Sequence, residues 1–289
     1  MLWLWLYLSL TAAVTLATVD ALSKYALKDS GEEVVAWASW GFAAPFLLAT
    51  LPFIEIPTLD LTFWMATILA LPLELVAVLF YIRSIKISPL SLSIPFLALT
   101  PVFLIATSFF MLGELPDSSG VAGIILIAVG AYLLNLNSSG KGFLAPLKAI
   151  SREKGSLLMI AVSFIYSITS NLGKIAVLHS SPQFFAATYT TIFSIFFLPY
   201  VIFKERKAAA IIKARIPLFL LIGIVFAIMV MAHFLAIRLV EVAYMISVKR
   251  TSLIFSVLYG WLVFKEEHIR ERLLGCVVMV MGVVLITLF

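Results

Sequence analysis

Two adjacent cations, Lys249 and Arg250, stand inside the apolar segment Ala243–Phe264. At about 1.5 Å per residue this segment is about 33 Å long as a helix, which is enough to span a bilayer. A cation near the centre of a bilayer costs between about 2.5 and about 15 kcal/mol, so it usually faces a protein interior or a water-filled cavity. The pair therefore predicts a site where a negatively charged group is bound within the membrane.

One face of the same segment carries mostly small side chains at spacings of three and four residues. The residues on this face are Met245, Lys249, Ser252, Ser256 and Gly260. Such a face suits a helix that borders a substrate path. The alternative is structural: Lys249 reaches the membrane interface along its alkyl chain, and Arg250 pairs with a carboxylate.

Two carboxylates stand inside other apolar segments. Asp20 lies four residues before Lys24, so it either forms a helix ion pair with that lysine or carries a proton. Glu74, which is flanked by apolar residues, either balances the charge of Lys249 or Arg250 or accepts a proton. We favour the counter-charge for Glu74, because an anionic substrate could then displace it from the cations.

Further residues in the apolar segments are candidates for contact with a substrate, namely Trp40, Tyr166, Asn171, His233 and Tyr244. Each of these types of residue could instead have a structural role without contact to a substrate. A lone histidine packs in a core more often than it binds a ligand, although one that titrates in a cavity would matter. Hydroxyl and amide side chains hold membrane helices together, and tryptophans gather at the membrane interface.

Composition sets the class of protein. Hydrophobic residues make up 63% of 289, charged residues make up 12%, and the mean hydropathy is +1.14. These values exclude a soluble globular domain, and long apolar runs without alternation favour membrane-spanning helices over a barrel. The net charge of +5 is not a sign of nucleic-acid binding, because the basic residues stand mainly in loops.

The sequence offers no obvious catalytic centre. One cysteine and three scattered histidines supply neither a disulfide, nor a metal cluster, nor a nucleophile with its base. A phosphate-binding motif of the form GxxxxGK[ST] is also missing, which argues against transport powered by the chain's own ATP hydrolysis. We therefore expect no cofactor and no enzyme activity.

Polar turns separate the apolar segments and predict ten membrane-spanning helices. The first segment is expected to be retained, because the N-terminus lacks the basic residues of a secretory signal. The segments are Leu2–Ala26, Val34–Phe53, Leu61–Ile82, Leu90–Leu112, Val121–Leu136, Ser156–Leu178, Phe184–Phe203, Ile216–Ile237, Ala243–Phe264 and Leu273–Phe289.

The second half of the chain repeats the first. At an offset of 152 residues, three pairs align without a gap: Glu114 with Glu266, Gly123 with Gly275, and Gly130 with Gly282. The chain thus divides into five segments within residues 1–137, a linker loop at 138–155, and five segments within 156–289. Because each half has an odd number of segments, the second is inverted relative to the first. Many secondary transporters are built in this way and bind substrate between the halves, near the midplane.

These features resemble the EamA-type branch of the drug/metabolite transporter superfamily. Lys24 and Lys174 close the first segment of each half, and the motif LGE, which ends at Glu114, precedes the aligned glycines. The second copy of the motif reads FKEE, with Lys265 in place of the usual glycine. The resemblance implies an all-α fold of ten transmembrane helices, arranged as two inverted five-helix repeats, and a function in transport.

The ninth segment is similar in one respect to the plastid phosphate translocators of the same superfamily, in which a Lys-Arg pair holds the substrate phosphate. Leu97 and Ala98 align with Lys249 and Arg250 in the other half, so the fourth segment supplies no further cation. A carboxylate therefore stays open as the bound group. The fourth segment also contains prolines, which predict a bend in it.

Sixteen of the twenty lysines and arginines stand near segment ends on one side. The positive-inside rule then places both termini outside the cytoplasm in a plasma (inner) membrane. We interpret the chain as a secondary transporter that works by alternating access on a small anionic or zwitterionic metabolite, such as an amino acid, an organic acid or a phosphorylated compound. Its partners would be this substrate and the lipid bilayer, with coupling to protons or to a counter-substrate; a homo-oligomer is left open. The alternative is a non-transporting membrane scaffold or a lipid-handling protein.

Overall fold

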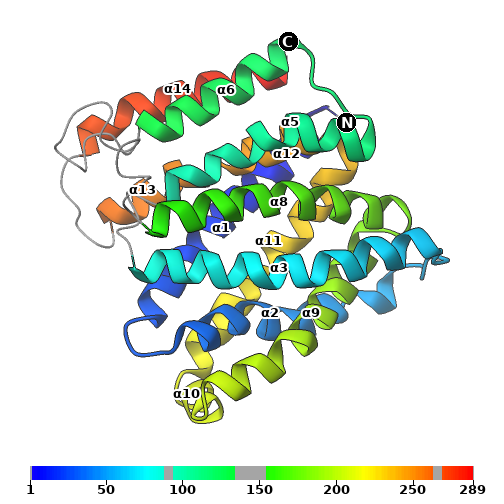
Figure 1. Ribbon diagram of the computed structural model, residues 1–289, viewed down its shortest axis with the longest axis vertical. Coiled ribbons are helices and arrows are strands. Elements are labelled where there is room, and N and C mark those ends of the chain that lie inside the picture. The colour runs from blue at the N-terminus through cyan, green and yellow to red at the C-terminus, as the bar shows by residue number, and fades with distance from the viewer. Residues whose placement is uncertain (1, 88–93, 134–153, 263–268, 289) are drawn as a thin grey trace.

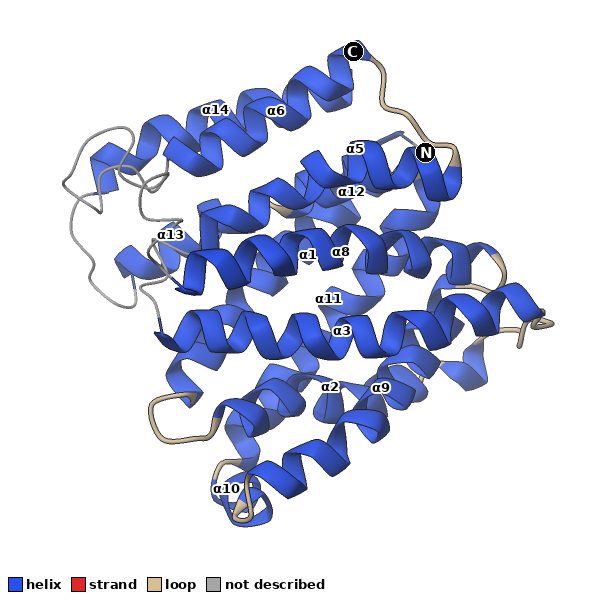
Figure 2. Cartoon of the chain, viewed as in Figure 1, coloured by secondary structure: helices blue, strands red, loops and turns tan. Residues whose placement is uncertain are grey.

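The computed structural model describes residues 2–87, 94–133, 154–262 and 269–288. Every regular element in these ranges is a helix, and Figure 2 shows helices joined by loops. In chain order the elements are α1 Leu2–Ala26, α2 Glu32–Leu48, η1 Leu51–Phe53, α3 Leu61–Ile87, η2 Ile94–Ala98, α5 Leu99–Leu112, α6 Ser118–Leu133, α8 Lys154–Leu178, α9 Pro182–Lys204, α10 Ala208–Ala214, α11 Ile216–Leu239, α12 Val242–Lys249, α13 Ser252–Leu262 and α14 Ile269–Leu288. The elements labelled η are 3₁₀ helices.

Six described stretches are long and apolar enough to cross a membrane, namely Trp3–Ala26, Glu32–Phe53, Leu61–Ile87, Lys154–Leu178, Pro182–Lys204 and Ile216–Leu239. Shorter apolar helices cover Phe96–Leu112, Ser118–Leu133 and Leu274–Leu288. A helix is the natural form for such segments in lipid, because it satisfies the backbone hydrogen bonds within the segment itself.

Large apolar side chains lie on the outside of the molecule. The exposed fractions of Phe53, Phe110 and Phe203 are 87%, 83% and 82%. A soluble monomer rarely exposes a continuous surface of this kind, whereas hydrocarbon chains contact it favourably. The prediction of a membrane protein made of helices is therefore confirmed.

The main helix contacts join the first half of the chain to the second. In Figure 1, α3 lies beside α8 and α6 lies beside α14, and α1 packs against α11 behind them. The segments α1 and α3 of the first half correspond to α8 and α11 of the second. The contacts α1–α11 and α3–α8 are therefore equivalent to each other, as a two-fold relation between the halves requires.

Glycines in α6 and α14 show the same two-fold relation at atomic scale. A Cβ atom added to Gly123 would lie 2.7 Å from the carbonyl oxygen of Gly282, and one added to Gly282 would lie 2.6 Å from that of Gly123. Likewise, a Cβ atom on Gly130 would lie 2.7 Å from the oxygen of Gly275. The repeat aligns Gly123 with Gly275 and Gly130 with Gly282. The contact of Gly123 with Gly282 is therefore equivalent to the contact of Gly275 with Gly130, as in a symmetric interface. Small residues let the two backbones approach this closely.

Candidate functional site

The segment that carries the cation pair is not one continuous helix, as the sequence predicted for Ala243–Phe264. Helix α12 ends at Lys249, Arg250 and Thr251 form a turn, and α13 begins at Ser252. The hydroxyl of Thr251 donates a hydrogen bond to the carbonyl oxygen of Val248 at 2.7 Å, and the Thr251 amide donates to the same oxygen at 3.0 Å. These bonds tighten the chain into a three-residue turn in place of the α-helical ladder.

The equivalent segment of the first half is interrupted at the equivalent place. The 3₁₀ helix η2 ends at Ala98, and α5 begins at Leu99. An offset of 152 residues sets Leu97 and Ala98 over Lys249 and Arg250. The sequence predicted a bend in this segment; the structure shows a change from a 3₁₀ helix to an α-helix there, and the break after Lys249 is a counterpart that the sequence did not reveal. Broken helices at matching positions of two repeats are typical of transporter binding sites.

A cavity of about 190 Å³ lies between the two halves. Its lining contains residues that the offset of 152 aligns: Tyr81 with His233, Glu74 with Phe226, and Leu97 with Lys249. The two halves therefore present corresponding surfaces to one space. Seven of the predicted site residues line this cavity: Asp20, Trp40, Glu74, Tyr166, His233, Lys249 and Arg250.

Arg250 is buried, with 6% of its surface exposed. One terminal nitrogen donates a hydrogen bond of 2.8 Å to the hydroxyl of Thr100, while Nε is buried and has no hydrogen-bond partner among the described residues. A guanidinium carries five N–H donors in a fixed plane, and buried donors in native structures are nearly always paired. Arg250 therefore lines the cavity as a cation, and one of its buried donors has no partner among the described residues.

Lys249 contacts α11, the helix that precedes α12 in the chain. Its Nζ lies 3.3 Å from Nδ1 of His233. When Lys249 is protonated its amine can only donate, so Nδ1 then accepts and the neutral ring carries its hydrogen on Nε2. His233 thus orients the lysine toward the cavity that both residues line.

The carboxylates of the cavity come from the first half of the chain. The hydroxyl of Tyr81 donates to Oδ1 of Asp20 at 3.0 Å, and Glu74 lies beside the hydroxyl of Thr169. Among the described residues, no ion pair within 4.0 Å joins Asp20 or Glu74 to Lys249 or Arg250. Opposite charges therefore face the same cavity without direct contact.

Aromatic rings form the rest of the wall. The ring centroid of Trp40 lies 4.9 Å from that of Phe226 and 6.2 Å from that of Tyr189, and the Phe185 centroid lies 4.8 Å from that of Phe234. All five residues line the cavity. The cavity thus combines charged groups with an extensive apolar surface, as small-molecule sites commonly do.

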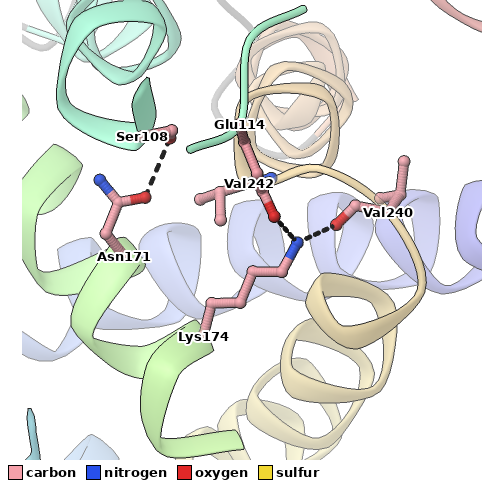
Figure 3. Close-up of polar contacts among 6 residues, drawn as sticks. All are labelled: Ser108, Glu114, Asn171, Lys174, Val240 and Val242. Atoms are coloured by element: carbon pink, nitrogen blue, oxygen red, sulfur yellow. Dashed lines mark hydrogen bonds and ion pairs between the residues drawn. The ribbon is translucent and has the colours of Figure 1, made fainter. Parts of the chain in front are cut away.

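Three predicted site residues do not line the cavity. Asn171 joins helices: its Oδ1 accepts from Ser108 at 2.9 Å (Figure 3). Its Nδ2 donates to Thr107 at 3.1 Å. The hydroxyl of Tyr244 lies 3.2 Å from Oδ1 of Asp117, at the entrance of α6. Ser252 is 5% exposed within the protein and is not part of the lining.

Sequence reasoning missed Thr100, which binds Arg250, and Tyr189, which adds a ring to the wall. A signal for Thr100 exists, since an offset of 152 aligns it with Ser252 beside the cation pair. No comparable signal marks Tyr189, whose part in the cavity depends on how α9 is rotated.

A second polar cluster closes one end of the helix bundle, and Figure 3 shows it. Nζ of Lys174 contacts Oε1 of Glu114 and donates to the carbonyl oxygen of Val240 at 2.9 Å, while Oε2 of Glu114 accepts from the amide of Val242 at 3.0 Å. We call Glu114, Lys174, Val240 and Val242 the latch. It joins α5 of the first half to α8, α11 and α12 of the second.

The position of Glu114 depends on a glycine. Gly113 follows α5 with φ of 70°, a left-handed conformation that favours glycine over other residues. Its amide bonds to the carbonyl oxygen of Phe109 at 3.1 Å, which ends the helix and turns the chain toward α12. The second copy of this motif, around Lys265 and Glu266, lies outside the described residues.

The surroundings of two acidic groups near the latch shift their pKa values. Asp117 accepts a hydrogen bond from the amide of Gly120 at 2.7 Å, which lowers the pKa of Asp117. Burial, together with the nearby charge of Glu114, raises the pKa of Glu241, whose Oε2 is buried without a hydrogen-bond partner among the described residues.

The Glu241→Gln variant is expected to unfold at a higher temperature than the wild type at pH 7.5 and at the same temperature near pH 4. A carboxyl group whose folded-state pKa is raised contributes stability below its unfolded pKa of about 4.3 and loses it as the pH rises through the folded value. Glutamine removes the penalty of ionisation at neutral pH. Thermal unfolding in detergent at both pH values tests this expectation, and a lower midpoint for the variant at pH 7.5 would contradict it.

Three comparisons with known proteins bear on this geometry. A family model described as the EamA-like transporter family matches residues 3–136 and again residues 153–288. A solved structure described as "Crystal structure of protein" is 17% identical in sequence and superposes with a TM-score of 0.78. The match covers 98% of this chain and 98% of the chain in that structure. At that identity the likeness shows the fold alone. No curated protein sequence matches the chain.

Proposed function

This chain belongs to the EamA-like transporter family, and on that premise we propose that it is a secondary transporter that moves a small anionic or zwitterionic metabolite by alternating access. The family is one of membrane transporters, and the chain is a multi-pass membrane protein built from two repeats. The observation that carries the proposal is Arg250, a buried cation that lines a cavity between the repeats and whose Nε has no hydrogen-bond partner in the described part of the chain.

The proposed architecture is ten transmembrane helices in two inverted repeats, within residues 1–137 and 156–289, with a linker between them. Two of the ten would be the broken helices η2–α5 and α12–α13. The uneven distribution of lysine and arginine supports placing the termini, and with them the latch, on the non-cytoplasmic side of the membrane. The resemblance to phosphate translocators rests on Lys249 and Arg250 alone.

Substrate binding would use the two halves differently. Arg250 and Lys249 would hold a carboxylate or phosphate from the second half, since charge-assisted hydrogen bonds to an anion satisfy their donors. The carboxylates Asp20 and Glu74 face them from the first half. A zwitterion would complement both sets of charges, whereas a phosphate dianion would complement only one of them. The aromatic wall would bind an apolar part of the same molecule.

Coupling would follow from the same charges. Asp20 and Glu74 can each exchange a proton when the cavity opens to one side of the membrane, so transport would depend on protons or on a counter-substrate. Tyr166, Trp40 and His233 would shape the site. A transporter of this kind needs a site that is accessible from each side in turn, and two related halves provide it.

Flux into liposomes tests the function directly. Purified protein is reconstituted and supplied in turn with radiolabelled amino acids, organic acids and phosphorylated sugars. We expect sustained, saturable uptake or exchange for at least one zwitterionic or anionic compound. The absence of flux above that of empty liposomes for the whole panel would contradict the proposal.

The Glu74→Gln variant is expected to bind a zwitterionic substrate about tenfold to a hundredfold more weakly, because a hydrogen bond to a charged group contributes about 1.5–3 kcal/mol. The deaminated analogue of the same compound, which keeps only the carboxylate, should not lose affinity. Competition assays with both compounds measure the difference. The matched control is Glu55→Gln, which removes an exposed carboxylate outside the cavity. Equal losses for both compounds would remove Glu74 from the binding of a cationic group.

A further inference from the structure

The latch is a closely bonded contact between the halves. Glu114 uses both carboxylate oxygens, one for Lys174 and one for the amide of Val242, and Lys174 also donates to Val240. The side chains of Lys174 and Glu114 are 8% and 19% exposed. An ion pair that is largely withdrawn from water is weakened less by solvent and salt than a surface pair. The latch therefore holds this end of the bundle together.

The latch also lies next to the cavity. Gly173 lines the cavity, and the following residue on α8 is Lys174. Lys174 is tied to Val240, which follows the last turn of α11, and α11 contributes His233 and Phe234 to the same lining. A route from the cavity to this end of the bundle along α8 would have to separate α8 from the ends of α5 and α11. The contacts of the latch stand across that route.

Helix α12 connects the latch to the cation pair. It has eight residues, with Val242 bound to Glu114 at its first turn and Lys249 at its last. Its length is only about 12 Å, so its two ends move together as one rigid element. A second contact reinforces the first: Tyr244 on α12 lies 3.2 Å from Asp117, and its ring fills the space beside Gly120, where an added Cβ atom would lie 2.1 Å from the Tyr244 hydroxyl oxygen.

We propose that the Glu114–Lys174 pair is the gate that closes the cavity toward this end of the bundle, and that Glu114 positions the cation pair through α12. Opening would break the ion pair and release the start of α12, so that Lys249 and Arg250 shift as the cavity becomes accessible. The inference rests on the proposed function and assigns the gate and its linkage to named residues. Bistable contacts between packed elements are a common basis of such transitions.

Thiol accessibility tests the gate without a known substrate. The sole cysteine, Cys276, is replaced by alanine, and a reporter is introduced in the cavity as Ser170→Cys on α8 or Ile246→Cys on α12. A membrane-impermeant methanethiosulfonate reagent is applied from the latch side, and the rate of modification is measured. We expect Glu114→Gln and Lys174→Met to raise this rate at least tenfold at both reporters, and Lys174→Arg to keep it near that of the unmutated latch.

The matched control is the ion pair at the other end of α11. Arg215 precedes α11 and pairs with Asp29, whereas Val240 follows α11. The Asp29→Asn variant should leave the rate from the latch side unchanged. Unchanged rates in Glu114→Gln and Lys174→Met, with unfolding temperatures like that of the wild type, would overturn the gate. A rise at Ser170→Cys without a rise at Ile246→Cys would overturn the linkage through α12. Neither result depends on flux, so the gate can fail while the proposed function stands.

Discussion

Replacing Arg250 by methionine is expected to lower the affinity for the transported anion at least about a hundredfold and to abolish measurable flux. Each hydrogen bond from a guanidinium to an anion contributes about 1.5–3 kcal/mol, and two such bonds are available to a bound carboxylate. The Arg250→Lys variant keeps the charge but loses the planar set of donors, so an intermediate loss is expected. Transport into liposomes with a compound that the wild type accepts provides the measurement.

The same substitution separates a functional role from a structural one. Arg250 has no counter-ion within 4.0 Å among the described residues, and its hydrogen bond to Thr100 involves a neutral partner. An unpaired buried cation is costly, so methionine should leave the unfolding temperature unchanged or raise it. The Lys204→Met control removes an exposed cation at the end of α9 and should alter neither flux nor stability. Normal flux in Arg250→Met would remove this residue from the mechanism.

The largest effect on stability is expected at the glycine contact between α6 and α14. The Gly282→Val variant places a Cβ atom 2.6 Å from the carbonyl oxygen of Gly123, and a backbone atom cannot rotate away as a flexible side chain can. Overpacking of this kind costs typically about 1–3 kcal/mol, and the branched side chain adds to the crowding. The two helices must separate, which also strains the relation between the halves.

Unfolding in detergent, followed by circular dichroism, measures this loss. The expected result is a clearly lower midpoint for Gly282→Val and also for Gly123→Val. The matched control is Val129→Leu, which adds volume on the exposed side of α6. A midpoint equal to that of the wild type in both glycine variants would show that α6 and α14 do not depend on close approach.

The sequence predicted the class of fold because membrane-spanning segments must be apolar, and this requirement is visible in the composition. Long apolar runs identify the helices, and aligned residues at a fixed offset identify the repeat. The reciprocal contacts of Gly123 with Gly282 and of Gly130 with Gly275 are what that alignment implies for halves related by a two-fold axis. The prediction of two EamA-like repeats is confirmed by the family match over both halves.

The broken helix at Arg250 could not be predicted in the same way. Neither proline nor glycine stands between Lys249 and Ser252, so local propensity gives no sign of a break there. The turn there contains the hydrogen bond from the Thr251 hydroxyl to Val248, and Arg250 donates to Thr100 across the repeats; neither contact is visible in the sequence. The counterpart in the first half was visible in the sequence because prolines mark it.

The site residues divide along similar lines. Charged groups in apolar segments, such as Asp20, Glu74 and Arg250, were predicted as site residues because burying a charge in a membrane is costly and such residues usually serve a function. Whether a hydroxyl or amide residue faces a cavity or a neighbouring helix depends on helix rotation, which the sequence leaves open. Asn171 and Tyr244 were therefore predicted as substrate contacts, while the structure places both in contacts between helices.

The mechanism depends on an anionic group that binds to Arg250 in the cavity between the halves. Thermal unfolding of the purified protein with a panel of amino acids, organic acids and phosphorylated sugars tests it most directly, because a ligand at about 100 times its Kd stabilises the folded state by about 2.7 kcal/mol. We expect at least one anionic or zwitterionic compound to raise the unfolding temperature of the wild type and of Lys204→Met but not of Arg250→Met. A compound that is transported and stabilises Arg250→Met as strongly as the wild type would contradict it.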